Sequence, residues 1–230
     1  GCVCAEGLVL HDGQCIKKTS CPCFSRGVQY STGESIKDVC NTCICEEGKW
    51  TCTDDSCDGI CKSTGVNHFE TFDGSVYDFV GECAYSLVEP IEPSDDNIWA
   101  VYLRYHDCEQ HVKKLCKKSI EVRVGESYFT FEAGFKTSHD GHVIEHFPIQ
   151  ANGVQVMMAS TFIQRIDITE IGISVFWNGK DRVYVHAQAD LRDSIHGLCG
   201  TFNDRTDDDL KIPDGTVQTS AVEFGNTWKA

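Results

Sequence analysis

One acidic loop near the end of the chain, residues 197–210, holds the residues best suited to chemistry. Its carboxylate and amide side chains are Asn203, Asp204, Asp207, Asp208 and Asp209. Carboxylate and amide oxygens are the ligands that calcium takes in proteins, so the loop is a candidate Ca2+ site. The alternative is a solvated acidic turn, because Asn, Asp and Gly favour turns for local reasons. The loop has no nucleophile with an adjacent base, which argues against covalent catalysis.

Residues 142–146 have the His-x-x-Glu-His spacing of one class of zinc peptidase. That chemistry requires a helix, because residues four apart must share a face. Here Gly141 precedes the segment, Pro148 follows it, and the Val-Ile pair inside it favours a strand. In a strand His142 and His146 would lie about 13 Å apart, whereas zinc requires nitrogens at about 2 Å. We therefore predict a half-exposed strand and no catalytic site.

Cys40 and Cys43 have the Cys-x-x-Cys spacing of redox and zinc sites. A redox pair would need the start of a helix in a thioredoxin-like setting, which the sequence lacks. A zinc site would need a second pair free of competing disulfides, and the many nearby cysteines favour structural disulfides instead. Phosphate-binding glycine loops and the Gly-x-Ser-x-Gly motif are also absent from the sequence. These motifs together indicate a protein that is not an enzyme.

The composition indicates a secreted protein. Of the 15 cysteines in 230 residues, eleven lie between Cys2 and Cys61, a density that requires an oxidising compartment. The net charge of −15 argues against nucleic-acid binding, which needs clustered Lys and Arg. Apolar runs are too short to span a membrane. Because the chain begins in the middle of a cysteine motif and has an odd number of cysteines, we expect it to be part of a longer protein.

The pattern changes near Asp58, which suggests two parts. The first, residues 1–57, is too short and polar for a good core, so disulfides must stabilise it. Within it, Asp12-Gly13 predicts a hairpin turn that Cys4 and Cys15 could close. The six cysteines between residues 23 and 57 allow fifteen pairings, which spacing alone does not resolve. Residues 58–60 are expected to join this part to an independently cored domain.

The second part, residues 61–230, reads as a mainly β domain. Alternating β-branched and aromatic runs occur at residues 85–88, 99–105, 120–124, 128–131, 154–158, 162–168, 171–177 and 183–186. Turn signals such as Asn152-Gly153 and Asn178-Gly179 separate them. Many short strands with frequent turns predict an antiparallel sandwich or barrel. Residues 188–194 could form at most a turn or two of helix.

One basic cluster lies within and beside a short loop that Cys108 and Cys116 would close. It comprises Lys113, Lys114, Lys117 and Lys118. Such a cluster could contact a sulfated glycan or an acidic protein. We favour a solvated hairpin tip whose charges also discourage pairing between sheet edges.

Several motifs, in order, resemble a known set of extracellular modules. Residues 65–74 (Gly-Val-Asn-His-Phe-Glu-Thr-Phe-Asp-Gly), 81–85 (Gly-Glu-Cys-Ala-Tyr), 197–203 (Gly-Leu-Cys-Gly-Thr-Phe-Asn) and 224–228 (Phe-Gly-Asn-Thr-Trp) resemble the von Willebrand factor type D (VWD) domain. Residues 23–34, 40–45 and 49–52 resemble the small E module beside it, and residues 1–22 resemble the tail of a trypsin-inhibitor-like (TIL) module. The resemblance implies three domains: 1–22 (TIL tail), 23–60 (E module) and 61–230 (VWD, an antiparallel β-sandwich-like domain).

The resemblance also implies the disulfides. The pairs are Cys4–Cys15, Cys23–Cys45, Cys40–Cys57, Cys43–Cys52, Cys61–Cys199 and Cys108–Cys116. Cys2 and Cys21 would bond to the front of the TIL module, and Cys83 to a cysteine just past Ala230. Many relatives carry two further cysteines, which are missing here at or near Glu92 and at His196. The acidic loop therefore lacks a Cys-x-x-Cys motif, which casts doubt on disulfide exchange there.

The resemblance implies a calcium site built on the acidic loop. Its ligands would be the side chains of Asp73, Asn203, Asp208 and Asp209 and the backbone carbonyl of Arg205. Thr201 stands where relatives often have Asn, so that ligand would be lost or replaced by a carbonyl or a water. Asp204 and Asp207 would face outward. Calcium accepts such irregular shells of 6 to 8 oxygens, whereas magnesium demands stricter geometry.

The implied function is a non-catalytic structural and assembly module of a large secreted multidomain protein of matrix, mucus, clotting fluid or egg coat. Its partners would be neighbouring modules or other copies of the parent protein, with a possible extracellular glycan or protein ligand. The alternative is a protease-inhibitory or ligand-binding module acting through the TIL part. The portion of that module that would carry an inhibitory loop is not in this sequence.

Overall fold

The computed structural model describes residues 4–38, 40–94, 98–106 and 116–230. The chain forms two compact units, Gly1–Cys57 and Asp58–Ala230. Gly59 and Ile60 pair with Ala187 and His186 in the sheet of the second unit. Residues 58–60, which we expected to join the units, therefore belong to the second one.

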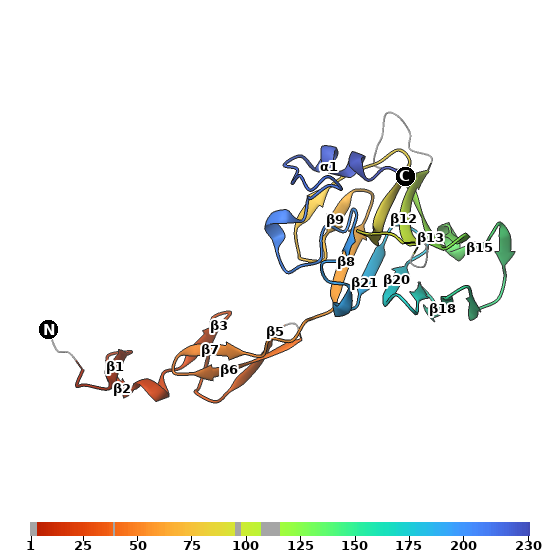
Figure 1. Cartoon of the computed structure of the whole chain (residues 1–230). Coiled ribbons are helices and arrows are strands. Elements are labelled where there is room, and N and C mark those ends of the chain that lie inside the picture. Colours follow the sequence, from red (N-terminus) through yellow and green to blue (C-terminus); the bar gives the residue numbers. More distant parts are fainter. Residues whose placement is uncertain (1–3, 39, 95–97, 107–115) are drawn as a thin grey trace. The chain divides into compact units, whose positions relative to one another are not determined.

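The first unit consists of short antiparallel strands. It contains the hairpin β1 (Leu8–His11) and β2 (Gln14–Lys17), the pair β3 (Cys23–Ser25) and β4 (Val28–Tyr30), and the three-stranded sheet β5 (Ser35–Asp38), β6 (Asn41–Glu46) and β7 (Lys49–Cys52) (Figure 1). The predicted hairpin at Asp12-Gly13 is confirmed, and both turn residues have positive φ, 46° and 80°. Positive φ at both central positions is the requirement of a type I′ hairpin turn.

Disulfides hold this first unit together. The structure contains Cys4–Cys15, Cys23–Cys45, Cys40–Cys57 and Cys43–Cys52, the same pairs that the resemblance implies. The only buried hydrophobic residues in the described part of this unit are Cys23, Cys43 and Cys45. Cross-links therefore supply the stability that a conventional core would otherwise provide.

The second unit is built from two antiparallel sheets (Figure 1). In the described residues, one sheet has the order β10-β9-β8-β21-β20-β19-β18-β17 and the other β16-β15-β14-β13-β12-β11-β22. The first sheet comprises β8 (Gly59–Thr64), β9 (His68–Glu70), β10 (Val76–Asp78), β17 (Ile149–Ala151), β18 (Val154–Ser160), β19 (Ile163–Ile168), β20 (Ile173–Trp177) and β21 (Val183–Ala187). The second comprises β11 (Ala84–Pro90), β12 (Trp99–His106), β13 (Lys117–Val124), β14 (Ser127–Phe131), β15 (Thr137–His139), β16 (His142–Ile144) and β22 (Ile195–His196).

Both sheets contribute to one hydrophobic core. Leu103 and Val122 of one sheet and Val175 and Val185 of the other are fully buried members of the same cluster. Because side chains alternate along a strand, these residues line the inner faces while their neighbours point outward. The predicted mainly β, antiparallel architecture is confirmed, and each of the eight predicted strand segments overlaps one observed strand. The short helical segment expected within residues 188–194 is the 3-10 turn η4 (Ala189–Leu191).

A short helix, α1 (Ala221–Thr227), follows the sheets and was not predicted. Ser220 caps its first turn by accepting a hydrogen bond from the backbone N–H of Glu223 at 3.3 Å. This Ser-x-x-Glu spacing is the signature of a capping box, so the sequence did carry a signal for the helix. Phe224 buries the inner face of the helix in the core.

The prediction for the basic cluster was wrong at one residue, Lys118. Lys113 and Lys114, and Cys108 of the expected Cys108–Cys116 pair, lie outside the described residues. Lys117 is exposed, but Lys118 is only 1% exposed. The solvated-tip interpretation is therefore wrong for Lys118, because alternation along β13 sends it into the core while its neighbour points outward.

The first three residues of the His-x-x-Glu-His segment form a strand, so the predicted strand is confirmed in part. Residues His142–Ile144 are β16, which pairs with β15, and His142, Glu145 and His146 are all exposed. The two histidines therefore lack the common helical face that a zinc peptidase would need.

Candidate metal site in the acidic loop

A disulfide brings the acidic loop to the start of the second unit. Cys61 of β8 bonds to Cys199, 138 residues further along the chain, with a Cα–Cα distance of 5.5 Å. Beside it, the backbone N–H of Phe72 donates to the carbonyl of Cys199 at 3.0 Å. The buried hydroxyl of Tyr77 donates to the carbonyl of Leu198. The segment from β8 to β10 thus provides a fixed platform for the loop.

Asp73 makes the direct contact with the loop. Its carboxylate accepts hydrogen bonds from the backbone N–H groups of Asn203 at 2.8 Å and Asp204 at 2.9 Å. The turn that presents Asp73 is completed by Gly74, whose φ of 98° favours glycine. Asp73 and Asn203, which the family resemblance implies as ligands of one calcium ion, are therefore adjacent although 130 positions apart.

Asn203 organises the loop from inside. Its amide nitrogen lies 3.3 and 3.1 Å from the two carboxylate oxygens of Asp208, to which it donates. Its amide oxygen accepts from the backbone N–H of Arg205 at 3.0 Å. The hydroxyl of Thr201, 3.5 Å from the carbonyl of Asp208, lies at the same place. Asn203 and Asp208 are thus also brought together, in a loop that is closed on itself.

Asp209 is the most buried member of the set, at 0% exposure. One carboxylate oxygen, Oδ2, accepts from the hydroxyl of Thr71 at 2.8 Å and from the N–H of Ser75 at 3.4 Å. The other, Oδ1, is buried and has no hydrogen-bond partner in the described structure. A Cβ atom at Gly200 would lie 2.8 Å from this Oδ1, so the glycine keeps the space beside it open. Sequence reasoning missed Thr71 and Ser75, whose roles depend entirely on tertiary placement.

The electrostatics of the loop disfavour two bare carboxylates. Burial raises the pKa of Asp209, and the charge of Asp73 raises it further, although hydrogen bonds from Ser75 and Thr71 oppose the shift. Burial likewise raises the pKa of Asp73, against the lowering effect of the backbone donors of the loop. Both shifts mean that the folded chain holds partly desolvated negative charges close together. A bound cation would offset the unfavourable free energy of holding these charges together.

Other acidic side chains of the loop point to solvent. Asp204, 72% exposed, pairs with Arg192, and Asp207, also 72% exposed, pairs with Arg205 at 3.0 Å. Arg205 therefore uses its side chain at the surface. Among the described residues, no three His, Cys, Asp or Glu side chains converge as a metal cluster. A calcium shell here would thus also need the amide oxygen of Asn203 and backbone oxygens.

A second polar cluster, which the sequence did not suggest, superficially resembles a catalytic triad. Ser127 Oγ lies 2.7 Å from His139 Nε2 and donates to Asp140 Oδ2 at 2.9 Å. Asp140 Oδ2 also lies 3.2 Å from the same imidazole nitrogen. In a triad the carboxylate binds the other ring nitrogen and leaves the base free for the hydroxyl. Because Asn152 also donates to Ser127 Oγ, at 2.9 Å, the cluster is a brace between turns and lacks the geometry of an activated nucleophile.

Comparison with known proteins gives a consistent result. Residues 61–216 match the family model of the von Willebrand factor type D domain. Over its whole length the chain is 31% identical to SCO-spondin of Gallus gallus, 30% identical to von Willebrand factor of Bos taurus and 33% identical to mucin-2 of Mus musculus. The chain spans only 4%, 24% and 5% of those proteins, respectively. None of the helices in the described part of the chain has the length and apolarity that a membrane crossing requires.

Proposed function

Because the chain belongs to the von Willebrand factor type D domain family, we propose that it is a non-catalytic, calcium-stabilised structural and assembly module of a large secreted protein. The observation that carries the proposal is the double connection between the start and the end of the second unit. Cys61–Cys199 connects them covalently, and the contact of Asp73 with Asn203 does so noncovalently. A domain fastened in this way is suited to hold its shape within a long chain.

A structural role agrees with the rest of the molecule. The disulfides of both units require an oxidising environment, which supports an extracellular location. The small first unit, which we assign to a TIL tail and an E module, is built for rigidity and has little core of its own. We therefore propose that the partners are neighbouring modules or other copies of the parent protein.

Calcium is proposed for the acidic loop on three grounds. Asp209 Oδ1 is buried without a partner, Gly200 leaves room beside it, and the pKa values of Asp73 and Asp209 are both raised by burial. The proposed donors are all hard oxygens, the type that calcium prefers. They are the side chains of Asp73, Asn203, Asp208 and Asp209 and the carbonyl of Arg205. When bound, the ion supplies positive charge that neutralises these carboxylates.

Thermal unfolding of the purified chain in calcium chloride and in a chelator tests the proposal. Binding to the folded state alone stabilises it by about 2.7 kcal/mol when free calcium is a hundred times the dissociation constant. The melting temperature is therefore expected to be higher in calcium, and Asp73→Ala should lose most of the difference. Equal melting temperatures in the two buffers would remove calcium from the proposal. An undiminished difference in Asp73→Ala would mean that the ligands are others.

A further inference from the structure

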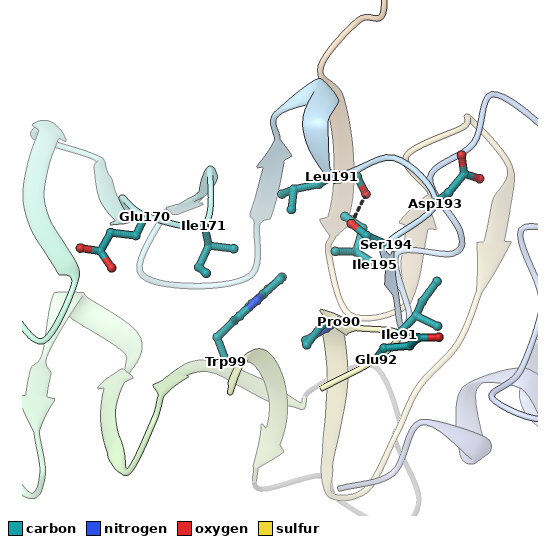
Figure 2. A pocket seen from close by; sticks show the side chains of 10 residues that line it. All are labelled: Pro90, Ile91, Glu92, Trp99, Glu170, Ile171, Leu191, Asp193, Ser194 and Ile195. Atoms are coloured by element: carbon teal, nitrogen blue, oxygen red, sulfur yellow. Dashed lines mark hydrogen bonds between the residues drawn. The ribbon is translucent and has the colours of Figure 1, made fainter. Parts of the chain in front are cut away.

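A cavity of about 570 Å³ opens where the two sheets end (Figure 2). Its apolar wall is formed by Pro90, Ile91, Trp99, Ile171, Leu191 and Ile195. These residues come from the end of β11, the start of β12, the turn between β19 and β20, the η4 turn and β22. No residue of the acidic loop lines it. A cavity of this size and lining can take one or two aliphatic side chains.

The charges of this cavity all have one sign. Among the described residues, Glu92, Glu170 and Asp193 line it, and no Lys, Arg or His does. All three are exposed, and none has a hydrogen bond or ion pair through its side chain in the described structure. Figure 2 shows Glu170 and Asp193 on opposite sides of the ring of lining residues, with the indole of Trp99 between them. An apolar interior between free carboxylates is complementary to an apolar group flanked by cations.

The shape favours a stretch of polypeptide over a compact small molecule. A second cavity of about 330 Å³ adjoins the first and shares Pro90, Ile91 and Trp99 with it. Its charged lining is mixed, because Arg123 and His196 line it together with Glu89, which lies 3.7 Å from the His196 imidazole, so the acidic rim belongs to the first cavity. The two together form a cleft along the edge strand β22 of the seven-stranded sheet. An extended segment can lie along such a cleft with one side chain inserted and its neighbours on either side directed to the rim.

We propose that this cleft, named here the Trp99 cleft, binds an extended basic segment of a partner protein. One aliphatic side chain of that segment enters the cavity, and Lys or Arg residues on either side of it meet Glu92, Glu170 and Asp193. The inserted side chain supplies most of the affinity, because burial of a Leu removes a large apolar area from water. The flanking cations supply orientation and a salt-dependent rate of association. This inference deepens the proposed assembly role and rests on it, but it is independent of calcium.

The test uses three capped peptide probes and the whole chain with methyl-labelled Ile and Leu. The probes are Gly-Arg-Leu-Arg-Gly, its acidic twin Gly-Glu-Leu-Glu-Gly, and Gly-Arg-Ser-Arg-Gly, which lacks the anchor. The first is expected to shift the methyl resonances of Ile91, Ile171 and Leu191 saturably at millimolar concentration. The acidic twin should not, and the Ser probe should bind about tenfold more weakly. The Ser probe separates docking from the general attraction of cations to a chain of net charge −15.

Two variants and one matched control locate the contact. Glu170→Gln should weaken binding of the first probe about threefold, the effect of one rim ion pair. Ile91→Ser, at a position already 42% exposed, should weaken it several-fold without disturbing the core. Glu145→Gln removes an equal charge beyond β16, the opposite edge strand of the same sheet, and should leave binding unchanged.

Three results would overturn the proposal: equal binding of the acidic twin, shifts confined to methyl groups outside the cleft, or no saturable shift with the first probe. A melt in calcium and in chelator on the same sample tests the calcium-stabilised module separately. If the first probe does not bind the cleft but calcium still raises the melting temperature, the docking proposal alone is rejected.

Discussion

The ammonium group of Lys118 donates a hydrogen bond to the hydroxyl of Ser63 at 2.8 Å, across the interior between the two sheets. Lys118 belongs to β13 and Ser63 to β8, and both are 1% exposed. The nitrogen also lies 5.6 Å from the ring centre of Phe69 and 5.8 Å from that of Tyr105. A buried cation held by one hydroxyl and two aromatic faces, with no carboxylate of the described residues bonded to it, should be sensitive to pH.

Lys118 should make the stability of the chain rise with pH above 8. Burial lowers the pKa of Lys118 from its usual 10.5 to about 8 in the folded state, and the negative charge of Asp181 opposes this shift. Between those values the unfolded chain binds more protons than the folded one, so deprotonation favours folding. Relative to Lys118→Met, the wild type should therefore gain about 3 kcal/mol of unfolding free energy between pH 8 and 10.5.

The measurement is urea unfolding of both proteins at several pH values in that window. Lys117→Met is the matched control, because Lys117 is the exposed neighbour in the same strand. Its stability should follow that of the wild type with pH. If the Lys118→Met and wild-type curves ran parallel, the ammonium group would not be desolvated as its position indicates.

Asp209→Asn should distinguish the destabilising effect of the buried charge from its role as a calcium ligand. The substitution removes a charge that burial disfavours while keeping an oxygen for Thr71 and Ser75. In chelator the variant should be at least as stable as the wild type. In calcium it should lack most of the gain of about 2.7 kcal/mol expected for the wild type at a hundredfold excess over the dissociation constant.

Asp207→Asn serves as the control for Asp209, because the Asp207 side chain is 72% exposed and faces solvent. It should respond to calcium almost as the wild type does. Differential scanning calorimetry of the three proteins in both buffers gives the comparison. A wild-type calcium response retained in Asp209→Asn would show that Asp209 is no ligand.

Gly200→Ala should destabilise the acidic loop by more than backbone strain alone. Gly200 has a φ of 74°, and its Cβ would approach Asp209 Oδ1 at 2.8 Å and Thr71 Cγ2 at 2.9 Å. Gly215→Ala is the control, with a φ of 90° but nothing within 4 Å of its Cβ. We expect the control to cost about 1 kcal/mol and Gly200→Ala about 2 to 4 kcal/mol by chemical denaturation. Equal losses would show that the space beside Asp209 is not tightly defined.

The strands were predictable where alternation is regular and long. β12 and β13 show why: large apolar residues recur at every second position and are buried, although the small residues Ala100 and Ser119 between them are buried too. The same period predicts that Lys118 faces the core. Its positive charge, however, suggested an exposed side chain, and that expectation was wrong. The three-residue strands β9, β10, β15 and β17 were missed because three residues are too few to establish a period.

The candidate site was predictable in part for a different reason. Asp73 and Asn203 were paired through the family pattern, and the structure places them in contact. The surroundings of Asp209 were not predictable, because Thr71 and Ser75 lie more than 130 positions away and meet it only through the tertiary fold. The Trp99 cleft likewise draws on five separate segments, so no local signal marks it.

Removing the Cys61–Cys199 disulfide should weaken calcium binding as well as the fold. The bond closes a loop of 138 residues, and its loss as Cys61→Ala/Cys199→Ala should cost about 5 kcal/mol by the chain-entropy estimate. Because the same bond holds the loop of Asn203 against the turn of Asp73, its absence means that calcium must order both segments when it binds. The calcium dissociation constant from calorimetry, below the melting temperature of the variant, should therefore rise at least several-fold. Cys4→Ala/Cys15→Ala, which opens a disulfide of the first unit, should leave that constant unchanged. An unaltered constant in the Cys61→Ala/Cys199→Ala variant would show that the ion and the disulfide act independently.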